Sequence, residues 1–168
     1  MNLYLLTFVT HNSRISERMI RLGILGGTPL ILNPSVRATV SSALARAAVE
    51  HSIPLLALNV LPDHAHVVAS IPSPLDVALV AQILKGRSSF VVRRSEMLSK
   101  QSHLWAQKFH RWPLRSETEV LDAVRYVLYN HLHHVEHWGS DLERTWESKI
   151  RPIVEEVCID LEELCARG

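Results

Sequence analysis

The stretch LLALNVLPDHAHVVASI, from Leu55 to Ile71, contains the features that decide the fold. It holds two apolar runs, Leu55–Leu61 and His64–Ile71, which are separated by Pro62-Asp63. Short apolar runs on both sides of a Pro-containing pair are typical of two strands joined by a tight connection. The stretch therefore predicts a β-hairpin.

The chain on either side of this hairpin alternates strands and helices. Leu3–Thr10 is rich in aromatic and β-branched residues, which predicts a buried strand. His11–Pro34 is rich in Gly and Pro and predicts a long irregular connection with room for a helical turn. The other predicted elements are a strand over Leu104–Arg115 and helices over Val36–His51, about Leu75–Met97, Ser116 to about His137, and around Val154–Ala166.

This order of strands and helices predicts the α+β class. We expect a two-layer sandwich in which helices cover one face of an antiparallel or mixed sheet, resembling a split βαβ fold. Residues 1–139 would form the domain, and residues 140–168 would be its C-terminal helical extension. Ser73-Pro74 is expected to cap the second helix, and Gly86 to break or bend it.

The composition is ordinary for one globular domain, with 47% hydrophobic and 21% charged residues in a chain of 168. No apolar run approaches the roughly 20 residues that span a bilayer. The first residues lack the basic segment and cleavage site of a signal peptide. Cys158 and Cys165 lie about two helical turns apart, too far to bridge, so we expect reduced thiols in a cytoplasmic protein.

The positive charge is concentrated in the middle of the chain. Residues 85–115 contain one acidic residue, Glu96, against eight basic ones: Lys85, Arg87, Arg93, Arg94, Lys100, Lys108, Arg111 and Arg115. This excess is typical of a surface that binds the phosphates of nucleic acid, although a solvated basic helix is the alternative. Trp112 lies among these cations and is a candidate platform for unpaired bases, whereas Trp105 and Phe109 also suit a core.

Two histidines of the predicted hairpin have the spacing of a metal site. His64 and His66 are separated by one residue, so on a strand they project from the same face. Histidines hydrogen-bonded near a turn are the alternative. His131 and His133 have the same spacing, but they fall in a predicted helix, where their side chains diverge by about 200° and do not chelate one ion.

A predicted helix supplies the complementary groups. Tyr126 and Asn130 are four residues apart and share one helix face. An Asn oxygen beside two imidazoles suits Mg²⁺ or Mn²⁺, and a phenol beside such a cation is a potential nucleophile towards phosphorus. Tyr129 is the rival nucleophile, and a core aromatic is the alternative role for Tyr126.

Leu61–Val68 (LPDHAHVV) resembles the signature of the HUH single-tyrosine transposases of the insertion-sequence 200/605 type and of their REP-associated relatives. Three further blocks occur in the family's order and resemble its basic helix, its Trp-containing strand and the helix that bears its nucleophile: Gln82–Phe90, Leu104–Arg111 and Val124–Asn130. The chain departs from the REP-associated pattern after Asn130, where His131-Leu132-His133-His134 replaces a Pro and a basic stretch.

The resemblance implies a ferredoxin-like fold of the HUH endonuclease type and a transposase that cleaves and rejoins DNA. Tyr126 would be the nucleophile that forms a 5′-phosphotyrosine bond. His64 and His66 would bind Mg²⁺ or Mn²⁺, with Asn130 at the position of the third ligand. The implied partner is single-stranded DNA with a hairpin. The implied assembly is a homodimer, or a monomer if the protein is of the REP-associated type.

Three functions are consistent with these residues. The first is an active nuclease and strand transferase, which the complete set of His64, His66, Tyr126 and Asn130 favours. The second is a catalytically inactive or domesticated protein that binds single-stranded DNA or hairpins. The third is a metal phosphohydrolase for small esters, which would leave the basic stretch unexplained.

Overall fold

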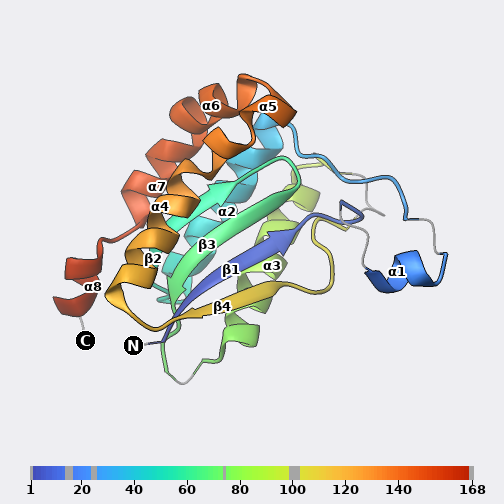
Figure 1. Ribbon diagram of the computed structural model, residues 1–168. Helices are drawn as coiled ribbons and strands as arrows, with labels where there is room; N and C mark the ends of the chain where they lie inside the picture. Colours follow the sequence, from blue (N-terminus) through green and yellow to red (C-terminus); the bar gives the residue numbers. More distant parts are fainter. Residues whose placement is uncertain (1, 14–16, 24–25, 74, 99–102, 167–168) are drawn as a thin grey trace.

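The computed structural model describes residues 2–13, 17–23, 26–73, 75–98 and 103–166. Its centre is a four-stranded antiparallel sheet with the strand order β2-β3-β1-β4 (Figure 1). The strands are β1 (Leu3–Val9), β2 (Leu55–Val60), β3 (His64–Ser70) and β4 (His110–Leu114). The predicted α+β class, hairpin and antiparallel sheet are confirmed, with the element order of ferredoxin-like folds.

Two long helices connect the strands, and a third follows β4. Side chains of Asn33, Asp76 and Ser116 cap these three helices by accepting backbone N–H groups of the first turn. The cap of the second helix is therefore Asp76 instead of Ser73, and this helix continues through Gly86 without a break. The helices are α1 (Glu17–Arg21), α2 (Pro34–Glu50), α3 (Val77–Arg94), α4 (Glu117–His133), α5 (Val135–Trp138), α6 (Asp141–Thr145), the π-helix η1 (Trp146–Ile150), α7 (Arg151–Val157) and α8 (Leu161–Ala166).

Helices cover both faces of the sheet (Figure 1). Side chains alternate along β3, so Ala65 and Val67 join the core formed with α2 and α3, whereas Val68 joins a second core formed with α4. The expectation that helices lie on one face holds for α2 and α3 but not for α4. The physical reason is that the apolar side of α4, with Val120 and Val127, buries itself against the other face of the sheet.

The turn between β2 and β3 is fixed from two sides. The N–H of Leu61 donates to the carbonyl of His64 over 2.8 Å and closes the turn. The N–H of Thr10 donates to the carbonyl of Asp63 over 2.9 Å, and the N–H of Leu32 donates to the carbonyl of Pro62 over 2.7 Å. The start of β3, which carries the candidate histidines, is therefore held by the end of β1 and by the connection before α2.

The strand predicted over Leu104–Arg115 is shorter in the structure, where β4 begins at His110. The Lys85 ammonium on α3 donates to the carbonyls of Ala106 and Gln107 over 2.8 and 2.9 Å. The Trp105 indole donates to the Ser88 hydroxyl over 2.9 Å. These contacts tie the segment before β4 to α3, and the segment pairs through an isolated bridge between Trp105 and Thr10, the residue after β1.

The C-terminal segment contains more helix than the sequence pattern predicts. Helical structure begins at Asp141 instead of near Val154, and η1 lies in the middle of it. Trp146 of η1 stacks on His131 of α4, with 4.8 Å between the ring centroids. The N–H of Ile159 donates to the carbonyl of Leu55 on β2 over 2.8 Å. This segment therefore packs on the domain. None of the described helices is both long and apolar enough to cross a membrane.

Both cysteines are free, as expected, but their environments differ. Burial raises the pKa of the Cys158 thiol to about 12, whereas Cys165 is exposed. Because the thiolate is the reactive form, we expect iodoacetamide at pH 8 to modify Cys165 in the native protein and to spare Cys158. Peptide mass spectrometry would measure the two rates, and a denatured sample is the control. Equal rates in the native protein would contradict the packing of Cys158 against the main core.

Candidate functional site

The two histidines of the hairpin lie side by side on the sheet face that α4 covers. His64 and His66 are both buried, and their ring centroids are 4.7 Å apart at an interplanar angle of 79°. Their spacing on β3 produces this arrangement, because residues two apart on a strand project from the same face. The sequence prediction that the pair shares one face is confirmed.

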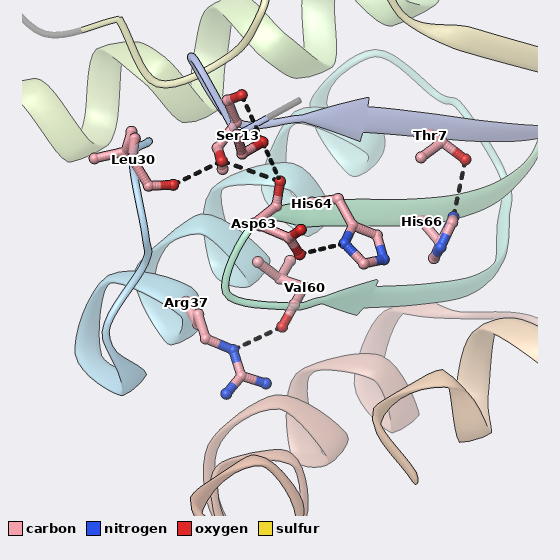
Figure 2. A network of polar contacts seen from close by, with 9 residues as sticks. Thr7, Ser13, Leu30, Arg37, Val60, Asp63, His64 and His66 are labelled. Carbon is pink, nitrogen blue, oxygen red and sulfur yellow. Dashed lines mark hydrogen bonds and ion pairs between the residues drawn. The ribbon is translucent and has the colours of Figure 1, made fainter. Parts of the chain in front are cut away.

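Each imidazole is oriented by a neighbouring polar group (Figure 2). The Nδ1 atom of His64 lies 2.5 Å from the Asp63 carboxylate, and the Nδ1 atom of His66 lies 2.9 Å from the Thr7 hydroxyl. A hydrogen bond at Nδ1 assigns the role of metal ligand to Nε2, and it fixes the ring plane. The sequence alone did not identify Thr7, although its place opposite His66 follows from the pairing of β1 with β3.

Helix α4 and its C-cap residue place three side chains on the side of the histidine pair. The Tyr126 ring lies 5.2 Å from the His66 ring, and the His134 ring lies 5.4 Å from the His64 ring. Asn130 lies midway between these two residues in the sequence, four residues from each, and it is buried against the sheet. Since residues four apart share a helix face, Asn130 faces the same pair of imidazoles.

Tyr126 and its rival Tyr129 differ in their surroundings. The Tyr126 side chain is 44% exposed, contacts His66, and stacks against His133 with 6.4 Å between ring centroids. Tyr129 is 58% exposed, and of these two tyrosines it is Tyr126 whose ring lies against the histidine pair. The arrangement leaves the Tyr126 phenol open to solvent on one side and beside an imidazole on the other.

The donor set suits a hard divalent cation. Asn130 is 1% exposed, and neither atom of its side-chain amide has a hydrogen-bond partner. An unsatisfied buried amide costs roughly 1–3 kcal/mol, which a cation on Oδ1 would offset. Within the described ranges, no three His, Cys, Asp or Glu side chains converge as a metal site, so a cation held by His64 and His66 would take its third protein ligand from another group, such as the Asn130 amide oxygen. Two imidazoles and this oxygen are donors that fit Mg²⁺ or Mn²⁺.

The histidines that follow Asn130 lie in different environments. His131 is buried against Trp146, and burial lowers its pKa, whereas His133 lies against Tyr126. The prediction that the His131 and His133 side chains diverge on a helix is confirmed. His134 is half-buried, and its pKa is lowered by burial and then by the nearby His64. Its place in the site is a finding that helical periodicity from Tyr126 and Asn130 would have revealed.

The basic residues predicted to bind DNA lie mostly away from the histidine pair. Lys85, Arg87, Arg93 and Arg94 belong to α3, which covers the opposite face of the sheet. Lys85 is bonded to backbone carbonyls, and desolvation lowers its pKa. Arg87 pairs with Glu50 over 3.3 Å. Lys100 lies outside the described residues.

The residues near β4 that were predicted to bind DNA are divided between the two faces of the sheet. Trp112 pairs with Leu5 in the ladder and so lies on the histidine face, where it is 67% exposed. Arg111 pairs with Leu6 and projects from the other face. Lys108 and Arg115 are exposed at the two ends of the strand. Trp112 is thus the member of this set that the structure brings onto the face of Tyr126.

Comparison with known proteins identifies a family model that matches the chain and solved structures that resemble it. No curated protein matches the chain. The family model described as "Transposase IS200 like" matches residues 29–130, which include His64, His66, Tyr126 and Asn130. The chain is similar to a REP-associated tyrosine transposase bound to a REP hairpin, with 16% identity, a TM-score of 0.53, and 79% of this chain and 68% of that chain covered. It also resembles a candidate transposase of Deinococcus radiodurans, with 18% identity, a TM-score of 0.47, and coverage of 76% and 89%.

Proposed function

Because the chain belongs to the IS200-like transposase family, we propose that it is a metal-dependent endonuclease and strand transferase for single-stranded DNA. The observation that carries this proposal is the position of the Tyr126 ring, 5.2 Å from the His66 ring and on the helix face of Asn130. The Tyr126 ring lies beside the imidazole pair, and the unpartnered buried amide of Asn130 lies on the same face of α4. That combination supplies both a nucleophile and the ligands of a cation.

His64 and His66 would hold Mg²⁺ or Mn²⁺ through Nε2, and Asn130 would hold it through Oδ1. When bound, the cation would polarise a non-bridging phosphate oxygen and stabilise the charge that develops at phosphorus. Asp63 and Thr7 would keep the two rings in their orientations through Nδ1.

Tyr126 would carry out the covalent step. Its phenol oxygen attacks the scissile phosphorus, the bond between phosphorus and the 3′-oxygen breaks, and the released strand leaves with a 3′-hydroxyl that takes up the proton. The product is a 5′-phosphotyrosine ester. Attack on this ester by the 3′-hydroxyl of another strand reverses the step and rejoins the DNA without an external energy source.

The proposed substrate is single-stranded DNA that carries a hairpin. The similarity in fold to a transposase bound to a REP hairpin supports this choice, as does an exposed Trp112 on the face of the site. Tyr126 and His66 meet within one chain, so a single subunit can complete the proposed site. The expected homodimer stays a prediction.

Incubation of the protein with Mn²⁺ and a 5′-labelled or 3′-labelled hairpin-bearing oligonucleotide tests the proposal. We expect an adduct that survives a denaturing gel and retains the 3′ label, because the tyrosine holds the 5′ phosphate of the downstream strand. The same reaction in EDTA, and a fully duplex oligonucleotide, should give no adduct. Cleavage without an adduct would favour a hydrolytic phosphodiesterase instead.

Replacement of Thr7 by Val tests the orientation of His66. The substitution keeps the shape of the side chain but removes the hydroxyl bonded to Nδ1. We expect Mn²⁺ affinity, measured by titration calorimetry without DNA, to fall roughly 10–100-fold, as is usual for loss of an outer-shell partner. Thr39→Val, which removes a hydroxyl bonded to the Ser35 carbonyl at the surface of α2, is the matched control. Unchanged affinity in Thr7→Val would argue against coordination by His66.

A further inference from the structure

A buried amide lies on the edge strand β2, beside the candidate site. Asn59 is fully buried on β2 and is the register partner of His66 on β3. Asn is depleted in strands, and burial of an amide costs free energy unless its polar atoms are bonded. An aliphatic side chain, like those of the neighbouring Leu58 and Val60, would suit this core position better. An amide is therefore expected at this position only if its polar atoms make a specific contact.

That contact reaches across to α4. The Nδ2 atom of Asn59 donates a buried hydrogen bond of 2.9 Å to the backbone carbonyl of Val127. Val127 directly follows Tyr126, so the bond holds the turn of α4 that carries the proposed nucleophile. The packing of Val120 and Ala123 on the sheet is apolar. Apolar burial is non-directional and tolerates rotation of a helix about its axis. A hydrogen bond to one carbonyl favours one rotation of the helix over the others.

The other polar atom of the Asn59 side chain, Oδ1, has a counterpart on α4 that is also without a hydrogen-bond partner. The Oδ1 atom of Asn59 is buried without a hydrogen-bond partner, and so are both amide atoms of Asn130. Val127 and Asn130 lie one turn apart on the side of α4 that faces the sheet. The acceptor on Asn59 and the donor on Asn130 are chemically complementary, but the two amides are not bonded to each other in this structure.

We propose that Asn59 is a positioning residue, which sets the rotation of α4 so that Tyr126 and Asn130 face the histidine pair. The inference rests on the proposed function for its catalytic consequence. Asn59 does not touch the DNA in this account. It acts through its hydrogen bond to the backbone carbonyl of Val127.

Two substitutions of Asn59 test this role against a matched cavity control. Asn59→Ala removes the amide and leaves a cavity, and Asn59→Leu removes the amide and fills the space. Val67→Ala leaves a cavity at an equally buried position in the core on the opposite face, next to α2 and α3. For all variants one would measure the thermal midpoint, DNA affinity, Mn²⁺ affinity and the rate of adduct formation at saturating DNA.

We expect both Asn59 variants to form adduct about tenfold more slowly than wild type and to bind Mn²⁺ more weakly, with DNA affinity unchanged. A loss of that size is expected from removal of one buried hydrogen bond. Val67→Ala should lower the thermal midpoint and keep the rate and the Mn²⁺ affinity. An equal loss of rate in Val67→Ala, or rates within about twofold of wild type in both Asn59 variants, would overturn the proposal.

Hydrogen exchange separates failure of this inference from failure of the proposed function. Without DNA or metal, we expect the amides of residues 126–131 to exchange about tenfold faster in Asn59→Ala than in Val67→Ala. If wild type forms no adduct but this difference is found, Asn59 positions α4 and the proposed chemistry is wrong. If the difference is not found, Asn59 does not position α4, whatever the activity.

Discussion

Tyr126→Phe is expected to eliminate the covalent protein–DNA adduct while the protein still folds and still binds DNA. The substitution removes only the phenol oxygen, which is the atom proposed to bond to phosphorus. Because the side chain is 44% exposed and its ring can still pack beside His66, the thermal midpoint should change little. Denaturing gels of the variant with Mn²⁺ and labelled hairpin DNA would measure the adduct, and anisotropy would measure binding.

Tyr129→Phe is the matched control for this experiment. It changes the same atom on the same helix, at an exposed position three residues further on. The control should form the adduct at close to the wild-type rate. Loss of adduct in Tyr129→Phe with an undiminished adduct in Tyr126→Phe would transfer the role of nucleophile to Tyr129 and would contradict the site described above.

His64→Ala and His66→Ala are expected to produce the second largest effect. Each removes one of two imidazoles from a site that offers few other donors, so Mn²⁺ affinity and adduct formation should both fall at least about 100-fold, the upper end of the cost of losing an outer-shell partner. Titration calorimetry with Mn²⁺ and the adduct assay at saturating DNA would measure the two losses.

His51→Ala supplies the control for the histidine substitutions. His51 is an exposed imidazole at the end of α2, the helix on the opposite face of the sheet. Its replacement should leave Mn²⁺ affinity and adduct formation unchanged. If His64→Ala and His66→Ala form adduct as fast as His51→Ala does, then the pair is a buried structural feature and the reaction does not depend on it.

The parts of the site that sequence predicted are those that depend on local periodicity. His64 and His66 follow the alternation of a strand, and Tyr126 and Asn130 follow the turn of a helix. Thr7 and Asn59 were missed because their roles depend on register partners that lie far away in the chain. His134 obeys the same helical spacing as Asn130 and falls within the helix predicted to about His137, so this spacing alone could have identified it.

The order of strands and helices could be predicted from the sequence, but the face of the sheet that each helix covers could not. Nothing in the local pattern of α4 states which face of the sheet it covers, because this depends on where the apolar surface of the assembled sheet is left open. For the same reason the sequence could not show that the cations of α3, which were predicted to bind phosphates, lie on the face of the sheet opposite the histidine pair. The boundaries of β4 and of the C-terminal helices were wrong because tertiary contacts of Lys85, Trp105 and Trp146 determine them.

Anomalous diffraction from crystals soaked in MnCl₂ would test the central claim most directly. We predict one strong peak bound by Nε2 of His64, Nε2 of His66 and Oδ1 of Asn130, with the Tyr126 phenol beside it on the solvent side. A bound Mn²⁺ at another place on the protein, with these two imidazoles and the Asn130 amide left without a cation, would contradict the account.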